Sequence, residues 1–496
     1  MTSTRLLARN TALNLFGQIA PLIVAVAAVP RLIAALGSDR FGVLMLAWAL
    51  IGYFGLFDFG IGRALTQAVS EALGRGDAAR LREVSAVALS FMFALGCAGA
   101  VVIAVLTPWL CYDLLKMDNV LRSEAAESFY LLAASLPFVL ATVGLRGLFE
   151  AHQHFGLATA LRVPYALFNF VGPLLIIPFT HSLVPIVAAL VVGRAATCAA
   201  HVWFSMRRYP WLREASLRNA SSMLPLLRLG GWMTVSNIIS PMMTYMDRFV
   251  IGALLSMTAV TYYGTPFEVI SKVMFVPAAV LGVFFPAFAT TFVQNRVHTA
   301  TILDRSARFM LIAMFPVVLV FVTMAREGLF VWVGPEFARQ STVVLQVLAV
   351  GVLINSFGQI PSSLLQAIGR ADLTAKAHMS EVLIYAAMLF GFARLYGLAG
   401  VAMAWTMRLV IDTGILAWLA RRHLPEAAPA IMTSIMWLTA MTAVLVLVSL
   451  PTATVPRATG GAAVLAGFVV LAWTRIILPP ERAAILEWFQ FDRAKG

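Results

Sequence analysis

Long apolar stretches alternate with short polar breaks along nearly the whole chain. A helix needs about 20 mostly apolar residues to cross the hydrocarbon core of a bilayer, and cutting the chain at charges, glycines and prolines leaves about fourteen such runs. The runs are residues 11–36, 41–62, 84–106, 128–150, 158–179, 184–206, 229–255, 259–287, 307–326, 341–367, 377–394, 398–420, 431–450 and 458–473. The pattern therefore predicts an all-α, polytopic membrane protein with about fourteen transmembrane helices.

The composition agrees with this prediction. Of the 496 residues, 61% are hydrophobic and 12% are charged, whereas soluble domains carry about 25% charged residues. The net charge of +13 would favour a nucleic-acid partner if the basic residues formed one patch or tail, but they are scattered between the apolar runs. The three cysteines, Cys97, Cys111 and Cys198, lie far apart. We therefore expect membrane lipids around the chain, no nucleic acid, and neither a metal site, a disulfide framework nor a cofactor.

The basic residues also indicate an orientation, because cytoplasmic loops of membrane proteins carry an excess of lysine and arginine. If the N-terminus is cytoplasmic, most of the 36 basic residues fall on the cytoplasmic side. The pattern thus predicts that both termini are cytoplasmic. The longest connections, residues 107–127 outside and 207–228 inside, are well below the ~50 residues of a minimal domain. No soluble catalytic module fits between the helices, so we do not expect an enzyme.

Two parts of the chain resemble each other. A shift of 214 residues aligns arginines on the sixth and twelfth runs, and a shift of 216 aligns the inner ends of the fourth and tenth. The aligned pairs are Arg194 with Arg408, Arg207 with Arg421, Arg208 with Arg422, Leu148 with Leu364, Ala151 with Ala367 and His154 with Arg370. A repeat of six helices, an even number, leaves both halves in the same orientation, related by an axis along the membrane normal.

This repeat predicts two parallel-related six-helix lobes followed by two C-terminal helices. The predicted parts are an N-terminal lobe at residues 1–208, a cytoplasmic linker at 209–228, a C-terminal lobe at 229–422, and helices thirteen and fourteen with a cytoplasmic tail at 423–496.

Four motifs carry a resemblance to a known family. They are Pro30-Arg31-Leu32 leading into Leu36-Gly37 and Phe41-Gly42, Tyr53-Phe54 through Asp58-Phe59-Gly60-Ile61-Gly62, Asp247-Arg248-Phe249-Val250-Ile251-Gly252 followed by Tyr262-Tyr263, and Tyr396-Gly397-Leu398-Ala399-Gly400-Val401-Ala402. With them the chain resembles the multidrug/oligosaccharidyl-lipid/polysaccharide (MOP) exporter superfamily, and within it the Wzx-type polysaccharide flippases.

The resemblance implies two six-helix lobes around a cavity. It also implies transport of a lipid-linked oligosaccharide, usually on an undecaprenyl diphosphate carrier, from the inner to the outer leaflet of the bacterial cytoplasmic (inner) membrane by alternating access. H⁺ or Na⁺ and the polysaccharide polymerase machinery would then be partners. The fourteen helices match the relatives that carry lipid-linked peptidoglycan precursor, and in these the last two helices suggest a shelter for the lipid tail, here residues 431–450 and 458–473.

Two other functions stay open beside the flippase for surface polysaccharide synthesis. A MATE-like small-molecule exporter of the same superfamily should carry membrane acids for cationic substrates and twelve helices. A membrane polysaccharide polymerase or ligase would need a sizeable outer loop with catalytic acids or histidine, and the outer loops are short.

Charges inside the apolar runs are the candidates for binding the cargo. A charged side chain at the bilayer centre costs about 2.5 to 3.5 kcal/mol on insertion scales, and Arg194 lies in the middle of its run with no acid within one turn. An arginine offers a bidentate fork to phosphate oxygens. The candidates for a cationic cavity are Arg194, Arg408, Arg31, Arg248 and Lys272. The alternative is that each charge pairs with a remote group and holds helices together.

The acids and aromatics of the runs have more than one interpretation. The coupling or gating candidates are Asp58, Asp247, Glu268, Glu381 and Asp412. Asp58 lies in a glycine-rich turn, where capping of the backbone or pairing with Arg63 favours a structural or gating role. Glu268 with Lys272, and Arg408 with Asp412, can neutralise each other at a spacing of four. Trp48, Tyr53 and Phe54 are candidates for stacking on sugar, with helix packing as the default interpretation.

Overall fold

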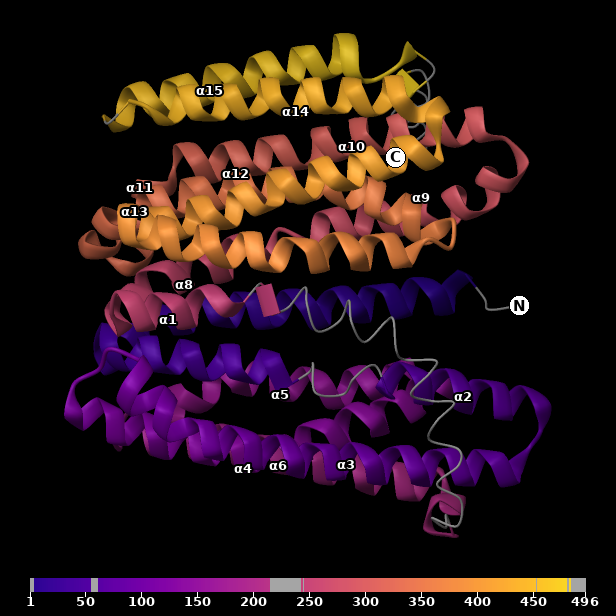
Figure 1. The fold of residues 1–496 in the computed structure, drawn as a ribbon, viewed down its shortest axis with the longest axis vertical. Helices are drawn as coiled ribbons and strands as arrows, with labels where there is room; N and C mark the ends of the chain where they lie inside the picture. Colours follow the sequence, from indigo (N-terminus) through magenta and orange to yellow (C-terminus); the bar gives the residue numbers. More distant parts are fainter. Residues whose placement is uncertain are drawn as a thin grey trace, which may run out of the picture. The chain divides into compact units, whose positions relative to one another are not determined.

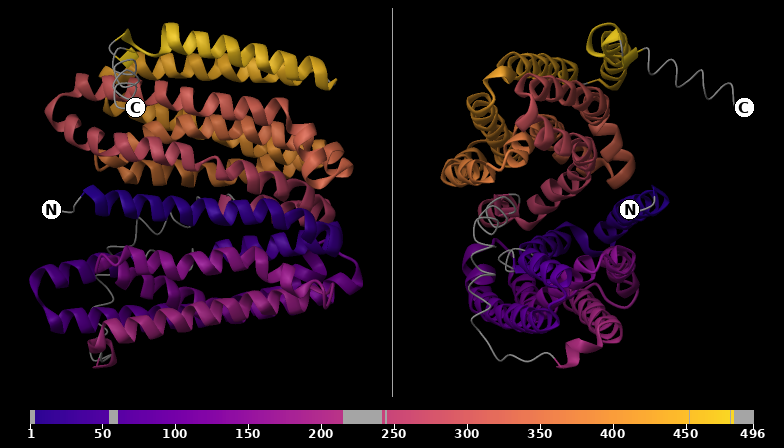
Figure 2. Two further views of the ribbon diagram at one scale, coloured as in Figure 1. Left: turned by 180° about the vertical axis from the view of Figure 1, so that it is seen from behind. Right: turned by 90° about the vertical axis from the view of Figure 1, so that its right-hand side faces the viewer.

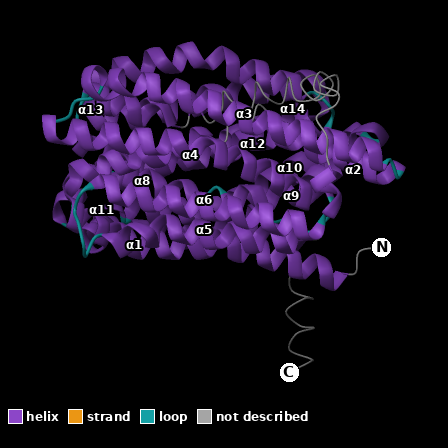
Figure 3. Ribbon diagram, turned by 90° about the horizontal axis from the view of Figure 1, so that it is seen from below, coloured by secondary structure: helices purple, strands orange, loops and turns teal. Residues whose placement is uncertain are grey.

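The computed structural model describes residues 4–54, 61–214, 242–243, 245–451, 453–479 and 481–482. Every regular element in these ranges is helical, and Figure 3 shows helices joined by short loops with no strand among the described residues. In the first part of the chain the elements are α1 (Thr4–Phe54), α2 (Ile61–Arg75), α3 (Ala78–Pro108), η1 (Trp109–Leu114), α4 (Asn119–Ala151), α5 (Phe155–Ile176), α6 (Leu183–Arg208) and η2 (Pro210–Glu214). They are followed by α8 (Met257–Lys272), α9 (Phe275–Gln294), α10 (Arg296–Thr323), α11 (Ala325–Val333), α12 (Pro335–Ala367), α13 (Ala371–His423), η4 (Pro425–Ala427), α14 (Ala428–Ser449), α15 (Thr454–Leu471) and η5 (Ala472–Ile476).

The helices confirm the predicted all-α, polytopic membrane fold. Among the described residues, 11 helical stretches are long and apolar enough to span a bilayer. Two of them, α1 and α13, each contain two predicted spans joined at a sharp bend, where Gly37 (φ 75, ψ 164) and Gly397 (φ 57, ψ −135) leave helical geometry. A positive φ favours glycine because it has no Cβ. The predicted seventh span, residues 229–255, lies largely outside the described residues.

The chain divides into two compact units, residues 1–265 with 389–398, and residues 266–388 with 399–496. Figure 2 shows that within each unit the helices run roughly side by side. The first unit includes residues 245–265, which the predicted lobe boundaries place in the C-terminal lobe. They are held there by Lys116, whose backbone N–H donates to the carbonyl of Gly252 over 3.0 Å, and by Thr261, whose hydroxyl donates to the carbonyl of Ser38 over 2.6 Å. The division into lobes stays a prediction.

In the first unit, α4 is the most deeply buried helix and packs against α3, α6 and α2. A Cβ added to Gly96 of α3 would lie 2.5 Å from the Cα of Pro137 on α4, so the absence of a side chain permits this close approach. Large apolar side chains such as Phe129 and Leu136 are fully buried on α4. Small residues at the contact and large ones beside it are typical of helix packing in membranes.

In the second unit, α12 has the same central place and packs against α9, α10, α11 and α14. The part of α13 that follows its bend also approaches α12 through small residues. A Cβ on Gly351 would lie 2.6 Å from the ring of Trp405, and one on Gly358 would lie 2.6 Å from the Thr413 hydroxyl. The Thr413 hydroxyl donates to the carbonyl of Ile354 over 3.3 Å.

The internal repeat is visible in the backbone. At the end of α4, His152 (φ −85, ψ 8) and Gln153 (φ 59) terminate the helix. At the end of α12, Ile368 (φ −88, ψ 12) and Gly369 (φ 79) have the same conformations. The next residues, His154 and Arg370, return equivalent N–H bonds of 2.8 Å to the preceding helix. The predicted shift of 216 residues at this end is therefore confirmed.

The ends of α6 and α13 repeat as well, with a register of 215 residues rather than the predicted 214. Tyr209 (φ −126, ψ 74) and Leu424 (φ −134, ψ 77) cap the two helices. Each is followed by a proline that begins a 3₁₀ turn, η2 or η4.

The last two helices belong to the second unit, where α14 and α15 run side by side (Figure 1). Near its start, α15 is bound to the end of α10 and to α11, because Arg457 donates to the Thr323 carbonyl over 2.7 Å and pairs with Glu327. After its end, Arg308 of α10 donates to the Ile476 carbonyl over 3.0 Å and pairs with Glu481. Ion pairs at both ends thus fix α15 along α10.

Candidate functional site

Arg194, at the middle of α6, lies buried inside the first unit. Its Nε donates to the Tyr165 hydroxyl of α5 over 2.6 Å, and its guanidinium carbon lies 5.5 Å from the centre of the Tyr165 ring. A Cβ on the neighbouring Gly193 would lie 2.8 Å from the ring of Phe168, so this glycine lets α5 approach α6. The hydrogen bond and the cation–π contact hold the guanidinium in one orientation.

Arg408, which the sequence aligns with Arg194, has a similar surrounding in the second unit. Its guanidinium carbon lies 5.5 Å from the centre of the Tyr385 ring, and both side chains are buried. Tyr385 precedes the bend of α13 at Gly397 and Arg408 follows it. In each unit an arginine of the later helix thus lies over a tyrosine of the helix before it.

Two acids and a histidine accompany Arg408. Glu381 lies one turn before Tyr385 and is 1% exposed, while Asp412 lies one turn after Arg408 and is 7% exposed. One oxygen of Asp412 lies 3.4 Å from Nε2 of His378, and Glu381 interacts electrostatically with Asp412 and Arg408. We call His378, Glu381, Tyr385, Arg408 and Asp412 the acidic cluster.

The carboxylate of Glu381 is the least satisfied member of the acidic cluster. Within the part of the chain that the structure describes, no N–H or hydroxyl group donates a hydrogen bond to either of its oxygens. A buried carboxylate without donors, beside a second carboxylate, is strongly disfavoured unless a proton or another cation joins the pair. The geometry is therefore suited to taking up a cation.

The acids are present in one copy of the repeat. Four residues after Arg194, where the second unit has Asp412, the first unit has Cys198. One turn before Tyr165, where the second unit has Glu381, it has Leu161. The two copies share an arginine and a tyrosine, and only the second adds carboxylates at these positions.

A third buried arginine lies after the segment that is not described. Arg248 is 1% exposed, and its guanidinium carbon lies 5.5 Å from the centre of the Tyr245 ring. The carboxylate of Asp247 accepts the Arg248 backbone N–H over 2.7 Å and the Tyr263 hydroxyl over 2.6 Å. Asp247 is thus bound to backbone and hydroxyl donors, which suits a structural role.

The remaining candidates are more exposed or lie outside the described part. Lys272 and Glu268 form the expected i,i+4 pair at 3.4 Å, with both side chains partly exposed. Arg31 is exposed and bonds at 3.4 Å to the carbonyl of Ala27 in its own helix. Trp48 is buried, with edge contacts to Phe41 and Phe170, and stacking on sugar stays a prediction. Asp58 and the side chains of Tyr53 and Phe54 lie outside the described residues.

Sequence reasoning missed the aromatic partners. Tyr165 and Arg194 are 29 residues apart, so no local spacing connects them. His378, Glu381 and Tyr385 recur at intervals of three and four residues, which places polar groups on one face of an apolar helix. That face is the signal that could have identified the acidic cluster.

A second pair of equivalent side chains lies at the helix ends. Nδ1 of His154 is 2.7 Å from the Tyr209 hydroxyl, and at the corresponding place Arg370 is 3.0 Å from Nε2 of His423. Burial lowers the pKa of His154, and the charges of Arg208 and His152 lower it further. Burial raises the pKa of Tyr209 to about 12. His154 and Tyr209 are therefore neutral at pH 7 and join α4 to the end of α6.

Comparisons of the sequence identify relatives. The model of a family described as polysaccharide biosynthesis protein matches residues 7–292, more than half of the chain. A protein of Shigella flexneri named for O-antigen transport is 28% identical over 415 residues, which are 84% of this chain and 97% of that protein. The lipopolysaccharide biosynthesis protein WzxC of Escherichia coli strain K12 is 23% identical over 385 residues, which are 76% of this chain and 73% of that protein.

Solved structures share the fold. The lipid II flippase MurJ in an inward closed conformation matches with a TM-score of 0.71 and 11% identity, over 95% of this chain and 100% of that one. An inward-facing multidrug resistance MATE transporter of the MOP superfamily matches with a TM-score of 0.68 and 15% identity, over 86% of this chain and 99% of that one. At these identities the likeness shows the fold alone.

Proposed function

Because the chain belongs to the polysaccharide biosynthesis protein family, we propose that it is a flippase for a polyprenyl-diphosphate-linked oligosaccharide. It moves this lipid from the inner to the outer leaflet of the cytoplasmic membrane, with both termini cytoplasmic, by alternating access and without making or breaking a bond. The names of its relatives in Shigella and Escherichia, which refer to O-antigen transport and lipopolysaccharide biosynthesis, support this cargo.

The observation that carries the proposal is the buried, oriented guanidinium of Arg194 at the middle of a membrane-spanning helix. A diphosphate that enters the membrane loses water and needs cationic donors in its place. Arginine stays charged inside protein and can bind two phosphate oxygens at once. The bond to Tyr165 fixes the guanidinium plane, and a fixed plane is what a bidentate phosphate contact requires.

The acidic cluster has a different role in this proposal. Glu381 and Asp412 take up H⁺ or Na⁺, and the neutralised pair has a different packing energy from the charged one beside Arg408. The support is the burial of both acids, their electrostatic contact and the lack of donors to Glu381 among the described residues. Arg194 and Arg408, which the sequence treats alike, thus serve phosphate binding and cation coupling respectively.

A MATE-like exporter of small cations is the second candidate. The buried acids Glu381 and Asp412 favour it, because carboxylates in the membrane suit cationic substrates. The curated relatives named above favour the anionic lipid.

Depletion of the protein in its own host separates these candidates. We expect polyprenyl-diphosphate-linked oligosaccharide to accumulate in the inner leaflet, out of reach of a glycosidase added to the outer face of spheroplasts, while efflux of a cationic dye stays unchanged. Loss of dye efflux with no accumulation of the lipid would overturn the proposal and favour the exporter.

A further inference from the structure

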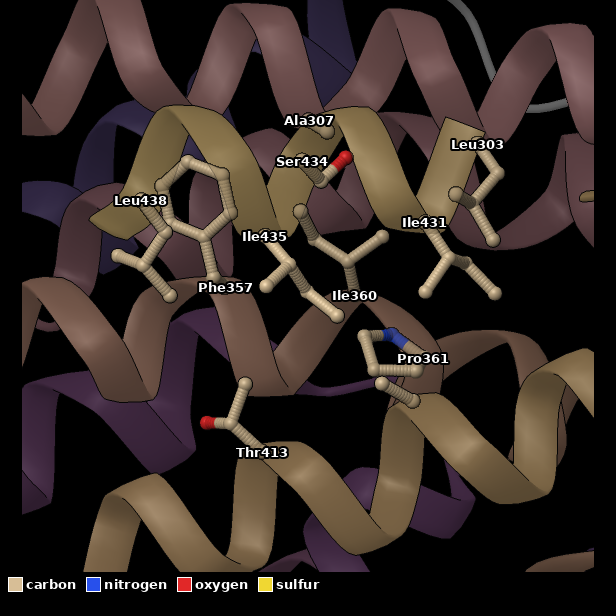
Figure 4. Close-up of a pocket in the computed structure, with 11 residues that line it drawn as sticks. Leu303, Ala307, Phe357, Ile360, Pro361, Thr413, Ile431, Ser434, Ile435 and Leu438 are labelled. Atoms are coloured by element: carbon tan, nitrogen blue, oxygen red, sulfur yellow. The ribbon is translucent and has the colours of Figure 1, made fainter. Parts of the chain in front are cut away.

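The second unit contains an apolar recess between α10, α12, α13 and α14 (Figure 4). It comprises about 380 Å³ of empty space, part of which is open at the surface. In Figure 4 the side chains of Phe357, Ile360, Ile435 and Leu438 point toward one another across it. We propose that this recess binds one acyl chain of an anionic phospholipid of the cytoplasmic leaflet, with the lipid phosphate at Arg421.

The walls of the recess suit hydrocarbon and no polar ligand. Its two hydroxyls are already engaged, since Ser434 donates to the Ala430 carbonyl over 2.8 Å and Thr413 donates to the Ile354 carbonyl over 3.3 Å. The remaining wall residues are apolar. A dry apolar cavity binds apolar groups because water finds no partners in it.

The recess is accessible from the lipid side of α14. Ile435 lines it and is 39% exposed, and Met432 and Met436 beside it are also exposed. Because α14 is one of the helices apolar enough to span a bilayer, its exposed apolar side faces acyl chains. A chain can therefore enter past Ile435 without crossing a polar surface.

The position of the recess along the helices places it near one membrane surface. Ala417 in its wall lies six residues before the end of α13, and Ile431 lies three residues after the start of α14. At 1.5 Å per residue these are roughly 9 and 5 Å from the helix ends. Exposed Trp418 and Arg422, 5.6 Å apart, mark the interfacial level on α13.

A positive charge lies where the phosphate of such a lipid would be. Thr413, Ala417 and Arg421 follow at intervals of four on α13, so they share one face of the helix. The first two line the recess, and Arg421 lies one turn farther toward the helix end and is exposed. Arginine near an anionic headgroup strengthens binding to the membrane surface.

The volume favours an acyl chain over the tail of the cargo. A methylene group occupies roughly the volume of a water molecule, about 30 Å³, so a recess of about 380 Å³ accommodates about a dozen methylenes. This matches most of one phospholipid chain and is far too small for a polyprenyl tail of undecaprenyl length. The site is therefore a binding site for a membrane lipid, independent of the proposed cargo.

The test uses the purified full-length protein in detergent with phosphatidylglycerol that carries a diazirine in one acyl chain. After irradiation, mass spectrometry should find the label in peptides that contain residues 303–307, 357–361 and 431–438. Ala417→Phe, which fills the recess, should remove most of this label at an unchanged melting temperature. Ser434→Leu fills it from the half-exposed side of α14 and serves if Ala417→Phe does not fold.

Charge recognition has a matched control in the other unit. Arg421→Ala should lower the pocket label from phosphatidylglycerol about fivefold and leave that from diazirine phosphatidylcholine unchanged, whereas Arg207→Ala, its counterpart in the first unit, should change neither. Label spread evenly over the exposed helix faces, or a pocket label that neither filling variant lowers, would overturn the proposal. So would competition by undecaprenyl phosphate that exceeds that of unlabelled phosphatidylglycerol, because the recess would then bind the carrier.

Discussion

Replacing Arg194 with methionine separates the cost of the buried charge from its use. The side chain is 5% exposed and lies in a membrane-spanning helix. A charge at that depth costs about 2.5 to 3.5 kcal/mol on insertion scales, while its charge-assisted bond to Tyr165 and the cation–π contact return about 2 to 4 kcal/mol. The two contributions nearly cancel, so Arg194→Met should keep the melting temperature within a few degrees of the wild type.

Transport should respond very differently. If Arg194 binds the diphosphate, the variant loses a charge-assisted contact of about 2 to 3 kcal/mol, which corresponds to roughly a 30- to 150-fold lower rate at limiting substrate. Arg194→Lys keeps the charge but not the fork, so its rate should be intermediate. Tyr165→Phe keeps the ring and removes the hydroxyl that orients the guanidinium, so it should reduce the rate by a smaller factor than methionine.

The assay follows a fluorescent polyprenyl-diphosphate oligosaccharide in proteoliposomes, where a membrane-impermeant reductant quenches the label in the outer leaflet. Equal incorporation of each variant is checked by immunoblot. A rate for Arg194→Met within twofold of the wild type would refute the assignment of phosphate binding to this residue.

Three further predictions concern the second unit. Glu381→Gln and Asp412→Asn should each make the transport rate insensitive to an imposed H⁺ or Na⁺ gradient, measured in the same vesicles, and a gradient response that persists in both would contradict coupling at the acidic cluster. Arg457→Met should lower unfolding stability by about 2 kcal/mol through loss of its buried bonds, seen as a lower melting temperature, and an unchanged value would mean that α15 is not held by this contact. Although burial alone raises the pKa of Glu327, bonds from Thr454 and Arg457 bring it below its ordinary value. The unfolded state therefore binds more protons than the folded state as the pH falls through the range near 4, and the melting temperature should drop there more in the wild type than in Glu327→Gln.

The sequence predicts the helical fold well because a bilayer leaves few alternatives: a long apolar run that must satisfy its own backbone becomes a helix. The repeat was also detectable, since the aligned ends of α4 and α12 have matching backbone conformations. The register at the ends of α6 and α13 was one residue off, because aligned arginines specify a helix face less sharply than the proline that follows each cap.

The site was predicted less completely because its partners come from different helices. Arg194 stood out as a charge without a local acid, but Tyr165 lies on another helix. Asp412 was paired in sequence with Arg408, four residues before it, whereas its carboxylate also lies beside His378 from the other side of the bend at Gly397. Spacing along one helix cannot reveal contacts that depend on how a bend folds two halves together.

The most direct test of the central claim measures the leaflet distribution of one lipid in vesicles that contain only this protein. A polyprenyl-diphosphate oligosaccharide incorporated at the inner leaflet should become accessible to an externally added glycosidase faster in proteoliposomes than in protein-free liposomes, and Arg194→Met should abolish most of the difference. Equal rates with and without the wild-type protein, in vesicles that still accumulate or release a cationic dye, would contradict the flippase account.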